Sequence, residues 1–194
     1  MKKTICILIF LILSSISGFS QETDEDNNDK YLKNYFYLVP LPAISKTFQI
    51  SYERILGNAK KSILISGGIL ATGDNNNMDL GFTDEIQFRL YLNDIRNSGK
   101  ENKFQFAFYF SPFIAHKYIK ADSYYYDYSN SISSGIISGW KGTYSRFVFD
   151  IFVGGGFKKS IINKNNEIFG GKDYWDDNYT GVFPKVGVQL GFSF

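Results

Sequence analysis

The sequence predicts an all-β fold, an eight-stranded antiparallel up-and-down transmembrane β-barrel. From residue 31 onward, segments of alternating apolar and polar residues recur between clusters of Gly, Asn, Asp and Ser, and almost no segment has a helical period. The residues that alternate with the large apolar side chains are mainly Gln, Ala, Gly, Ser and Tyr. Beyond the N-terminal segment, no apolar run approaches the roughly 18 residues that a membrane-spanning helix needs.

The stretch "KFQFAFYFSPF" predicts which way the large side chains point. Phenylalanine occupies every second position from Phe104 to Phe110, with Gln105, Ala107 and Tyr109 between them. A soluble sandwich would turn the rings inward and place Lys and Glu on its outer face. A small and polar face suits the lumen of a narrow barrel, so we predict that the rings face lipid and that closure of the sheet pairs the backbone groups. A soluble ligand-binding barrel of lipocalin type, the alternative, would have the opposite parity.

The N-terminal residues have the pattern of a secretory signal peptide. Lys2 and Lys3 precede an apolar run over residues 5–13, which is too short to cross a bilayer as a helix. We predict a signal peptide over residues 1–20, with cleavage before Gln21. An uncleaved membrane anchor is the alternative.

Cleavage would remove Cys6, the only cysteine, and with it any disulfide, thiolate metal site or cysteine nucleophile. It would also leave 19 basic and 19 acidic residues, because two of the 21 basic residues are lost, so no basic excess for nucleic acid is expected. Residues 21–30 are acidic with nothing to bury and are expected to be a disordered leader. Residues 31–194 then form one barrel domain.

Eight segments are candidate strands, and most of them have 9–14 residues, which suits tilted strands that need about 9–11 residues to span a bilayer. In the fourth, Ile86, Phe88, Leu90 and Leu92 alternate with polar residues, and the last segment repeats this pattern up to Phe194. The predicted strands are 33–40, 44–57, 61–72, 81–93, 102–120, 132–142, 145–158 and 182–194.

Connector lengths predict the orientation, because such barrels have short periplasmic turns, longer extracellular loops and both termini in the periplasm. On the predicted periplasmic side, the turns "GNAKK" at Gly57 and "KGT" at Lys141 are short, and the connector 94–102 is a long exception. On the other side, the connector 41–43 is a short exception, the one from Gly73 is of medium length, and those from Asp122 and over 159–181 are long. The two long loops are rich in Tyr, Ser and Asn, which form adaptable contact surfaces. The candidate contact residues are Tyr124, Tyr125, Tyr126 and Trp175.

Three charged residues fall on polar strand faces at comparable depth from the predicted periplasmic end. They are Glu53, Arg89 and Asp150, and we predict that they form an internal ion cluster with Gln189 nearby. Eight strands leave a lumen that side chains fill, and a buried charge needs a partner. The alternative is that the same charges line a conducting pore.

Two further features have both a structural and a functional interpretation. The stretch "GGGFKKS" from Gly154 lacks the Walker spacing and a following helix, so its glycines are interpreted as sites of bending and close backbone approach. His116, the only histidine, shares the strand face of Ile114 near the outer rim. With Ser123 or Asp122, it is the candidate residue for a lipid-modifying activity.

The ordered succession of "ISYERIL", "KSILISGGI", "IQFRLYL", "FYFSPFIAHKY", "GIISGWKGTYSRFVFDIFVGGGF" and "FPKVGVQLGFSF" resembles a porin-like family of small Gram-negative outer-membrane barrels that carry a domain of unknown function. The resemblance covers nearly all of the chain after the signal peptide. It implies an eight-stranded barrel that is located in the outer membrane. The terminal Phe194 is similar to the signal that the barrel assembly machinery reads, so the resemblance implies that machinery as a partner during biogenesis. It supplies no catalytic residues.

These observations favour an exported outer-membrane barrel that contacts lipid, is not an enzyme and has a structural or surface-interaction role through its extracellular loops, with an unknown ligand. A small-solute or ion channel is one alternative, which conductance in planar bilayers would distinguish. A lipid-modifying enzyme is the other, which the lipid A mass profile would distinguish. Neither a cofactor nor a nucleic-acid partner is expected.

Overall fold

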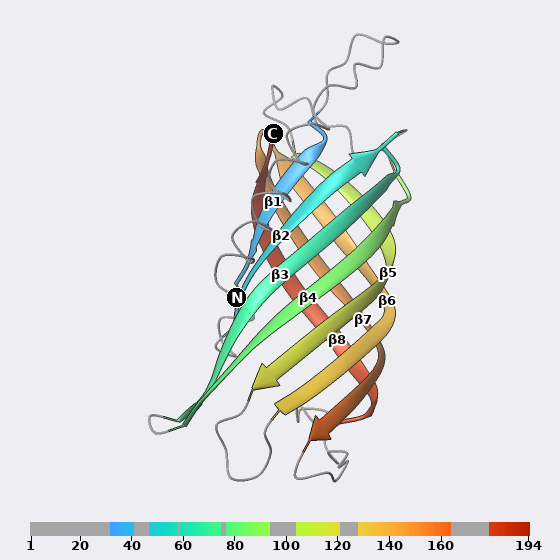
Figure 1. Ribbon diagram of the computed structural model, residues 1–194. Helices are drawn as coiled ribbons and strands as arrows, with labels where there is room; N and C mark the ends of the chain where they lie inside the picture. The colour runs from blue at the N-terminus through green and yellow to red at the C-terminus, as the bar shows by residue number, and fades with distance from the viewer. Residues whose placement is uncertain are drawn as a thin grey trace. The chain divides into compact units, whose positions relative to one another are not determined.

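In the computed structural model the chain forms a closed antiparallel barrel in which each strand pairs with its neighbours in sequence order (Figure 1). The structure describes residues 32–40, 47–57, 59–74, 77–93, 104–120, 128–163 and 179–194. The predicted signal peptide, residues 1–20, and the predicted leader, residues 21–30, lie outside them. The strands are β1 Asn34–Val39, β2 Thr47–Leu56, β3 Lys61–Asp74, β4 Asn77–Tyr91, β5 Phe104–Lys120, β6 Tyr128–Tyr144, β7 Phe147–Asn163 and β8 Gly181–Ser193. The predicted all-β, eight-stranded, up-and-down architecture is confirmed.

The barrel closes where the first strand pairs with the last. Tyr37 on β1 lies opposite Ser51 on β2 and opposite Gly191 on β8. Closure gives each strand two neighbours and so removes the sheet edges that would otherwise expose unpaired backbone groups. Among the described residues, no helix is long and apolar enough to cross a membrane.

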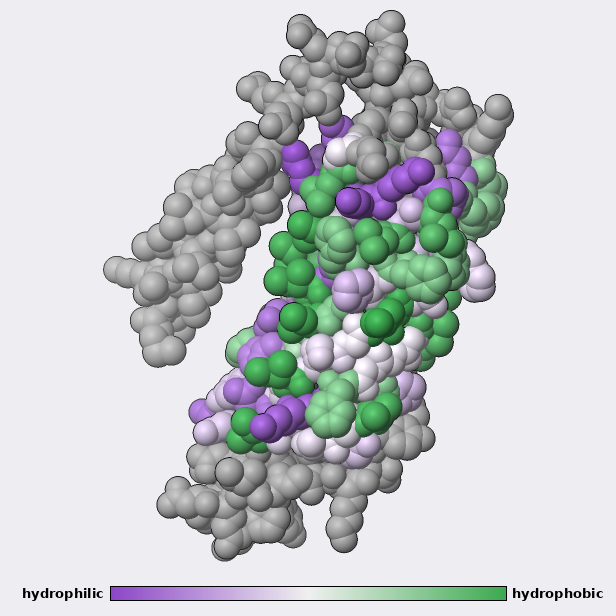
Figure 2. All heavy atoms as spheres, turned by 90° about the vertical axis from the view of Figure 1, so that its right-hand side faces the viewer, coloured by the Kyte–Doolittle hydropathy of each residue, from purple (hydrophilic) through white to green (hydrophobic). Residues whose placement is uncertain are grey.

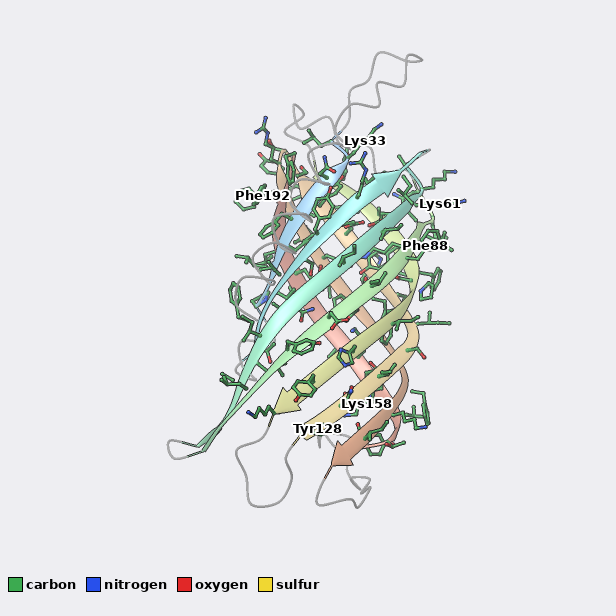
Figure 3. The ribbon with its side chains drawn as sticks, viewed as in Figure 1. Lys33, Lys61, Phe88, Tyr128, Lys158 and Phe192 are labelled. Atoms are coloured by element: carbon green, nitrogen blue, oxygen red, sulfur yellow. The ribbon has the colours of Figure 1, made fainter. Side chains whose placement is uncertain are left out.

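The two ends of the barrel differ in the strands that begin and end there. At the termini end, β1 begins and β8 ends, and Lys33 and Phe192 mark it in Figure 3. At the far end, β5 ends and β6 begins, and Lys158 and Tyr128 mark it in the same view.

Large apolar side chains point away from the lumen, the interior of the barrel. On β5, Phe104, Phe106 and Phe110 are 62, 58 and 46% exposed, whereas the alternating Ala107 and Tyr109 are buried. Figure 2 shows the resulting apolar surface, with hydrophilic residues gathered toward both ends of the described part. The parity predicted for the rings of Phe104, Phe106 and Phe110 is therefore correct, although Phe113 farther along the same strand faces the lumen and is 2% exposed.

The turn between β6 and β7 lies later than predicted. Its residues are Ser145 and Arg146, and Ser145 has the positive φ of 54° that tight hairpins require. Lys141, which the sequence placed in a turn, is instead an inward-facing strand residue that is 1% exposed. The prediction failed because Gly142 suggested a turn, whereas its missing Cβ makes room for the Phe149 ring, which would lie 2.2 Å from an added Cβ.

The medium-length loop predicted from Gly73 is also wrong. β3 and β4 remain paired up to Asp74 and Asn77, so only residues 75–76 connect them. At the far end, the long connectors are therefore those that follow β5 and β7, over residues 121–127 and 164–180.

Glycines let β6 and β7 approach each other closely. This agrees with the close backbone approach that was predicted for the glycines of residues 154–156. A Cβ added to Gly135 on β6 would lie 2.1 Å from the carbonyl oxygen of Gly155 on β7, and one added to Gly156 would lie 2.1 Å from the carbonyl oxygen of Ser134. Neither contact is possible without separating the strands.

Substituting Gly135 with alanine is expected to lower the free energy of unfolding by about 1–3 kcal/mol, because the neighbouring backbone must move. The matched control is Gly67→Ala on β3, where nothing lies within 4 Å of the added Cβ. That change is expected to stay within about 0.5 kcal/mol. Urea unfolding of the two variants in detergent measures the difference, and equal midpoints would contradict the close approach of β6 and β7.

Candidate functional site

A layer of buried charged side chains crosses the lumen. Arg89 on β4, Glu53 on β2 and Asp150 on β7 are all fully buried. The Arg89 Nη1 atom donates to Asp150 Oδ2 at 2.5 Å and to Glu53 Oε2 at 3.3 Å. The structure thus brings together the three charged residues that the sequence assigned to an internal cluster.

The fourth charge in the layer, Lys141, was missed by the sequence analysis. Its Nζ atom lies 3.0 Å from Glu53 Oε2 and 3.2 Å from the centroid of the Tyr35 ring. The layer therefore contains two cations and two carboxylates, so its formal charges balance. The parity of Lys141 with the buried Ile137 was the signal that could have identified it, had β6 been extended.

Hydroxyl groups satisfy the remaining acceptor positions of the two carboxylates. The Tyr109 hydroxyl donates to Asp150 Oδ1 at 2.8 Å. Glu53 accepts three further hydrogen bonds of 2.5–2.6 Å, which come from the hydroxyls of Tyr37, Ser62 and Tyr91. A buried ion pair is tolerated only when such hydrogen bonds compensate for lost hydration, and the tyrosines supply them here. The alternation in the sequence predicted that Tyr109 faces inward, but it did not indicate these hydrogen bonds.

Gln189 lies beside this layer rather than within its hydrogen-bond network. It is 2% exposed and opposite Asp150 in the pairing of β7 with β8, as predicted. Among the described residues, however, Gln189 Oε1 and Arg89 Nη2 are buried atoms that make no hydrogen bond.

Ion pairs connect opposite walls of the barrel at two levels. In the closed strand order, β2 and β6 are separated equally in both directions, so the Lys141–Glu53 pair spans the lumen. The same holds for β4 and β8, which the Lys185–Glu85 pair joins at 2.5 Å. We call the second pair the outer brace, because it lies nearer the far end than the charged layer does. On β4, Glu85 is closer to the far end than Arg89, and on β8, Lys185 is closer to it than Gln189, which pairs with Asp150.

The two levels are linked along β4. Gln87 donates from Nε2 to Glu85 Oε1 at 2.7 Å, and Arg89 donates from Nε to Gln87 Oε1 at 2.9 Å. The alternating inward residues of this strand thus form a continuous hydrogen-bonded chain from the outer brace to the charged layer. The charges are directed toward one another, which favours a rigid, filled lumen over a water-filled path.

His116 faces outward, near the far end of β5. Its Nδ1 atom lies 3.1 Å from Asp84 Oδ1, and its Nε2 atom lies 2.9 Å from Asn130 Oδ1. Both neighbours come from the adjacent strands. The partners considered from the sequence, Ser123 and Asp122, lie outside the described residues, so the lipid-modifying arrangement remains a hypothesis.

Phe194, the predicted assembly signal, lies at the termini end of the barrel. Phe194 exchanges backbone hydrogen bonds with Asn34 at 2.9 and 3.2 Å, and the residue is 49% exposed. Its part in barrel assembly stays a prediction. The candidate loop contacts Tyr124, Tyr125, Tyr126 and Trp175 lie outside the described residues.

Fold and lumen together define the class of the protein: a closed eight-stranded up-and-down barrel with an apolar outer wall and an ion-paired interior. No family model, curated protein or solved structure matches the chain. The resemblance to small Gram-negative outer-membrane barrels therefore stays a prediction.

Proposed function

We propose that the protein is an outer-membrane barrel of a Gram-negative-type bacterium, without catalytic activity, that holds its far-end loops in place for a structural or surface-interaction role. The observation that carries this proposal is an uncharged band on the outward face, bounded by charges on both sides. Membrane lipid is then the solvent of this band, and the barrel assembly machinery is the proposed partner during biogenesis.

The band has the height of a bilayer's apolar core. On β5, the outward positions over residues 104–114 are uncharged, and His116 and Lys120 follow them. At about 3.3 Å per residue and a tilt of about 40°, this run rises roughly 25 Å, which is the height of the apolar band of outer-membrane barrels. On β7, the outward positions over residues 147–157 are likewise uncharged and are followed by Lys159. The described charges that face outward or lie in the turns are Arg54, Lys60, Lys61, Asp84, Lys120, Arg146 and Lys159.

The lumen supports an anchor rather than a conduit. The Lys141–Glu53 pair and the outer brace both span it. The fully buried Tyr35, Tyr37 and Tyr109 pack against the cations of the charged layer, and the buried Phe113 ring packs against Lys185 of the outer brace. A barrel filled in this way holds its wall rigidly, so that the loops at its far end start from fixed positions. A conducting lumen, the alternative, would give steady current steps in planar bilayers.

Fractionation tests the proposed location. The protein is expected to remain with outer membranes through high-salt and carbonate washes, and its folded form is expected to migrate differently from the boiled form in detergent gels. Recovery of the protein in the soluble periplasmic fraction would refute the proposal. An altered lipid A mass profile on deletion of the gene would instead favour a lipid-modifying enzyme.

A further inference from the structure

We propose that the outward face of β5, β6 and β7 at the far end binds a membrane lipid whose headgroup carries two separated phosphate groups. The inference rests on the proposed function, because it takes membrane lipid as the surroundings of the outer wall, and it adds the kind of lipid and the place where it binds. The contacts to the two phosphates come from Lys120 on β5 and Lys159 on β7, which we call the lysine pair.

The lysine pair is available to anions outside the protein. Both residues are exposed and face outward, just beyond the uncharged band. Within the described part of the chain, neither residue makes an ion pair or a hydrogen bond. The inward-facing Lys141 and Lys185, by contrast, are each paired with a carboxylate of the barrel.

A described carboxylate also faces outward near the far end, but it does not neutralise the lysine pair. Asp84 on β4 lies beside His116, with 3.1 Å between Asp84 Oδ1 and His116 Nδ1. In the register of β4 to β7, Lys120 is one strand and four residues from Asp84, and Lys159 is three strands from it, so both Cα separations are about 14 Å. Attraction between exposed charges over such a distance is largely screened, because the Debye length is about 8 Å at physiological ionic strength. The outer wall around the lysine pair therefore carries a positive charge.

This positive charge is confined to one sector of the described barrel. On β1 to β4 and on β8, the outward strand residue closest to the far end whose side chain is described is apolar. These residues are Leu38, Phe48, Ala71, Leu80 and Val182. Cations that only anchor a barrel among headgroups are expected around its whole circumference, so the arrangement favours a lipid bound at one position.

The spacing of the lysine pair suits two phosphates better than one. Lys120 pairs with Tyr128 and Lys159 pairs with Ile132 on the intervening β6. The two lysines are thus two strand spacings and four residues apart, or about 16 Å between Cα atoms. Their side chains also diverge, because they leave a convex wall. One phosphate would hold both ammonium groups only if both stems stretched toward each other, at a cost in side-chain entropy, whereas two phosphates let each lysine bind separately.

The surface between the two lysines suits the remainder of such a lipid. Tyr128, Asn130 and Ile132 are the outward residues of β6 there. The Tyr128 ring stacks on the Tyr118 ring with 6.0 Å between centroids, and tyrosine is enriched at the level of lipid headgroups in membrane proteins. Ile132 is 60% exposed and adjoins the apolar wall, where acyl chains lie. Both the headgroup and the acyl chains of one lipid are therefore accommodated at this place.

Native mass spectrometry of the full-length protein tests the proposal. The protein is folded in a detergent without phosphate groups and mixed with lipid A, whose disaccharide headgroup carries two phosphates, or with its monophosphoryl form. The wild type is expected to retain one molecule of diphosphoryl lipid A and to bind it at least about fivefold more tightly than the monophosphoryl form, which offers one charge-assisted contact fewer. The double variant Lys120→Gln/Lys159→Gln is expected to bind diphosphoryl lipid A at least about tenfold more weakly than the wild type, because both contacts are lost. A migration difference between unheated and boiled samples verifies that each variant is folded.

The matched control is Lys61→Gln/Arg146→Gln. It also removes two exposed cations, but from the termini end, at the start of β3 and in the turn between β6 and β7. Its affinity for diphosphoryl lipid A is expected to stay within about twofold of the wild type, because distant exposed charges are screened. Equal weakening in the two double variants, or equal binding of the two forms of lipid A by the wild type, would overturn the proposed site.

Two further measurements keep the test decisive. Lys120→Arg/Lys159→Arg retains both charges and is expected to retain the preference for two phosphates, even if the glutamine variant does not fold. Loss of the preference in this folded arginine variant would contradict recognition by charge. Cardiolipin, whose two phosphates are joined through one glycerol, tests the spacing, and binding as tight as that of diphosphoryl lipid A would contradict recognition of separated phosphates.

Failure of this inference is distinguishable from failure of the proposed function. A protein that inserts into phospholipid vesicles but shows no preference for diphosphoryl lipid A would lack the lipid site and would still be a membrane barrel. A protein that does not insert into vesicles would refute both proposals.

Discussion

Replacing Arg89 with methionine is expected to lower the free energy of unfolding by about 3–5 kcal/mol, because it leaves a buried carboxylate without its cation. Asp150 would retain only its hydrogen bond from Tyr109, whereas Glu53 would retain Lys141. The loss is measured as a lower temperature at which the folded band disappears in unboiled detergent gels, and as a lower urea midpoint.

A second substitution separates lost charge pairing from lost packing. Arg89→Met/Asp150→Asn removes both members of one ion pair and leaves Glu53 paired with Lys141, so it is expected to be more stable than Arg89→Met alone. The control Arg54→Met removes an arginine from the outward face of β2 and is expected to cost less than about 1 kcal/mol. Unchanged heat resistance of Arg89→Met would show that the buried cluster does not stabilise the barrel.

Arginine in place of Ile151 is expected to destabilise the barrel in a bilayer by about 2–4 kcal/mol, because the charge would lie within the hydrocarbon. The matched change is Ile161→Arg on the same strand. The two isoleucines are 45 and 47% exposed and both face outward, but Ile161 lies beyond Lys159. Near the interface, the same charge is expected to cost about 0–1 kcal/mol.

The comparison of these two variants is independent of any ligand. Folding in phospholipid vesicles, followed by urea titration, gives the two free energies. A barrel whose outer wall is surrounded by water would tolerate both changes equally, since their exposed fractions are nearly the same. Equal costs would therefore contradict the membrane assignment, whereas a difference that depends on depth would support it.

Much of the charged layer could be predicted from the sequence, because a period of two fixes the face of each strand residue and position along the strand fixes its depth. Glu53, Arg89 and Asp150 followed from these two coordinates alone. Lys141 could not be predicted in this way, because the neighbouring Gly142 suggested a turn. In the structure, Gly142 instead lies within β6 and makes room for the Phe149 ring.

The outer brace could not be predicted for a different reason. Lys185 and Glu85 lie on strands that are far apart in sequence and do not pair, so their contact depends on which walls of the closed barrel face each other. Which residues face each other across the lumen depends on the shift in register between neighbouring strands, summed around the whole barrel. No single segment of the sequence encodes this sum. For the same reason, the hydroxyl contacts of Tyr37 and Tyr91 with Glu53 were not assigned, although their inward parity was readable.

The short first strand has a consequence for how the cylinder is put together. The lumen-spanning ion pairs connect β2 with β6 and β4 with β8, while β1 meets β8 only between Tyr35 and Leu38 and through the terminal residue. Detaching β1 would therefore break neither ion pair, although it would remove the Tyr37 hydrogen bond to Glu53 and the Tyr35 ring from Lys141. We expect the β1–β8 seam to open before the other strand pairs, because it has the fewest paired residues.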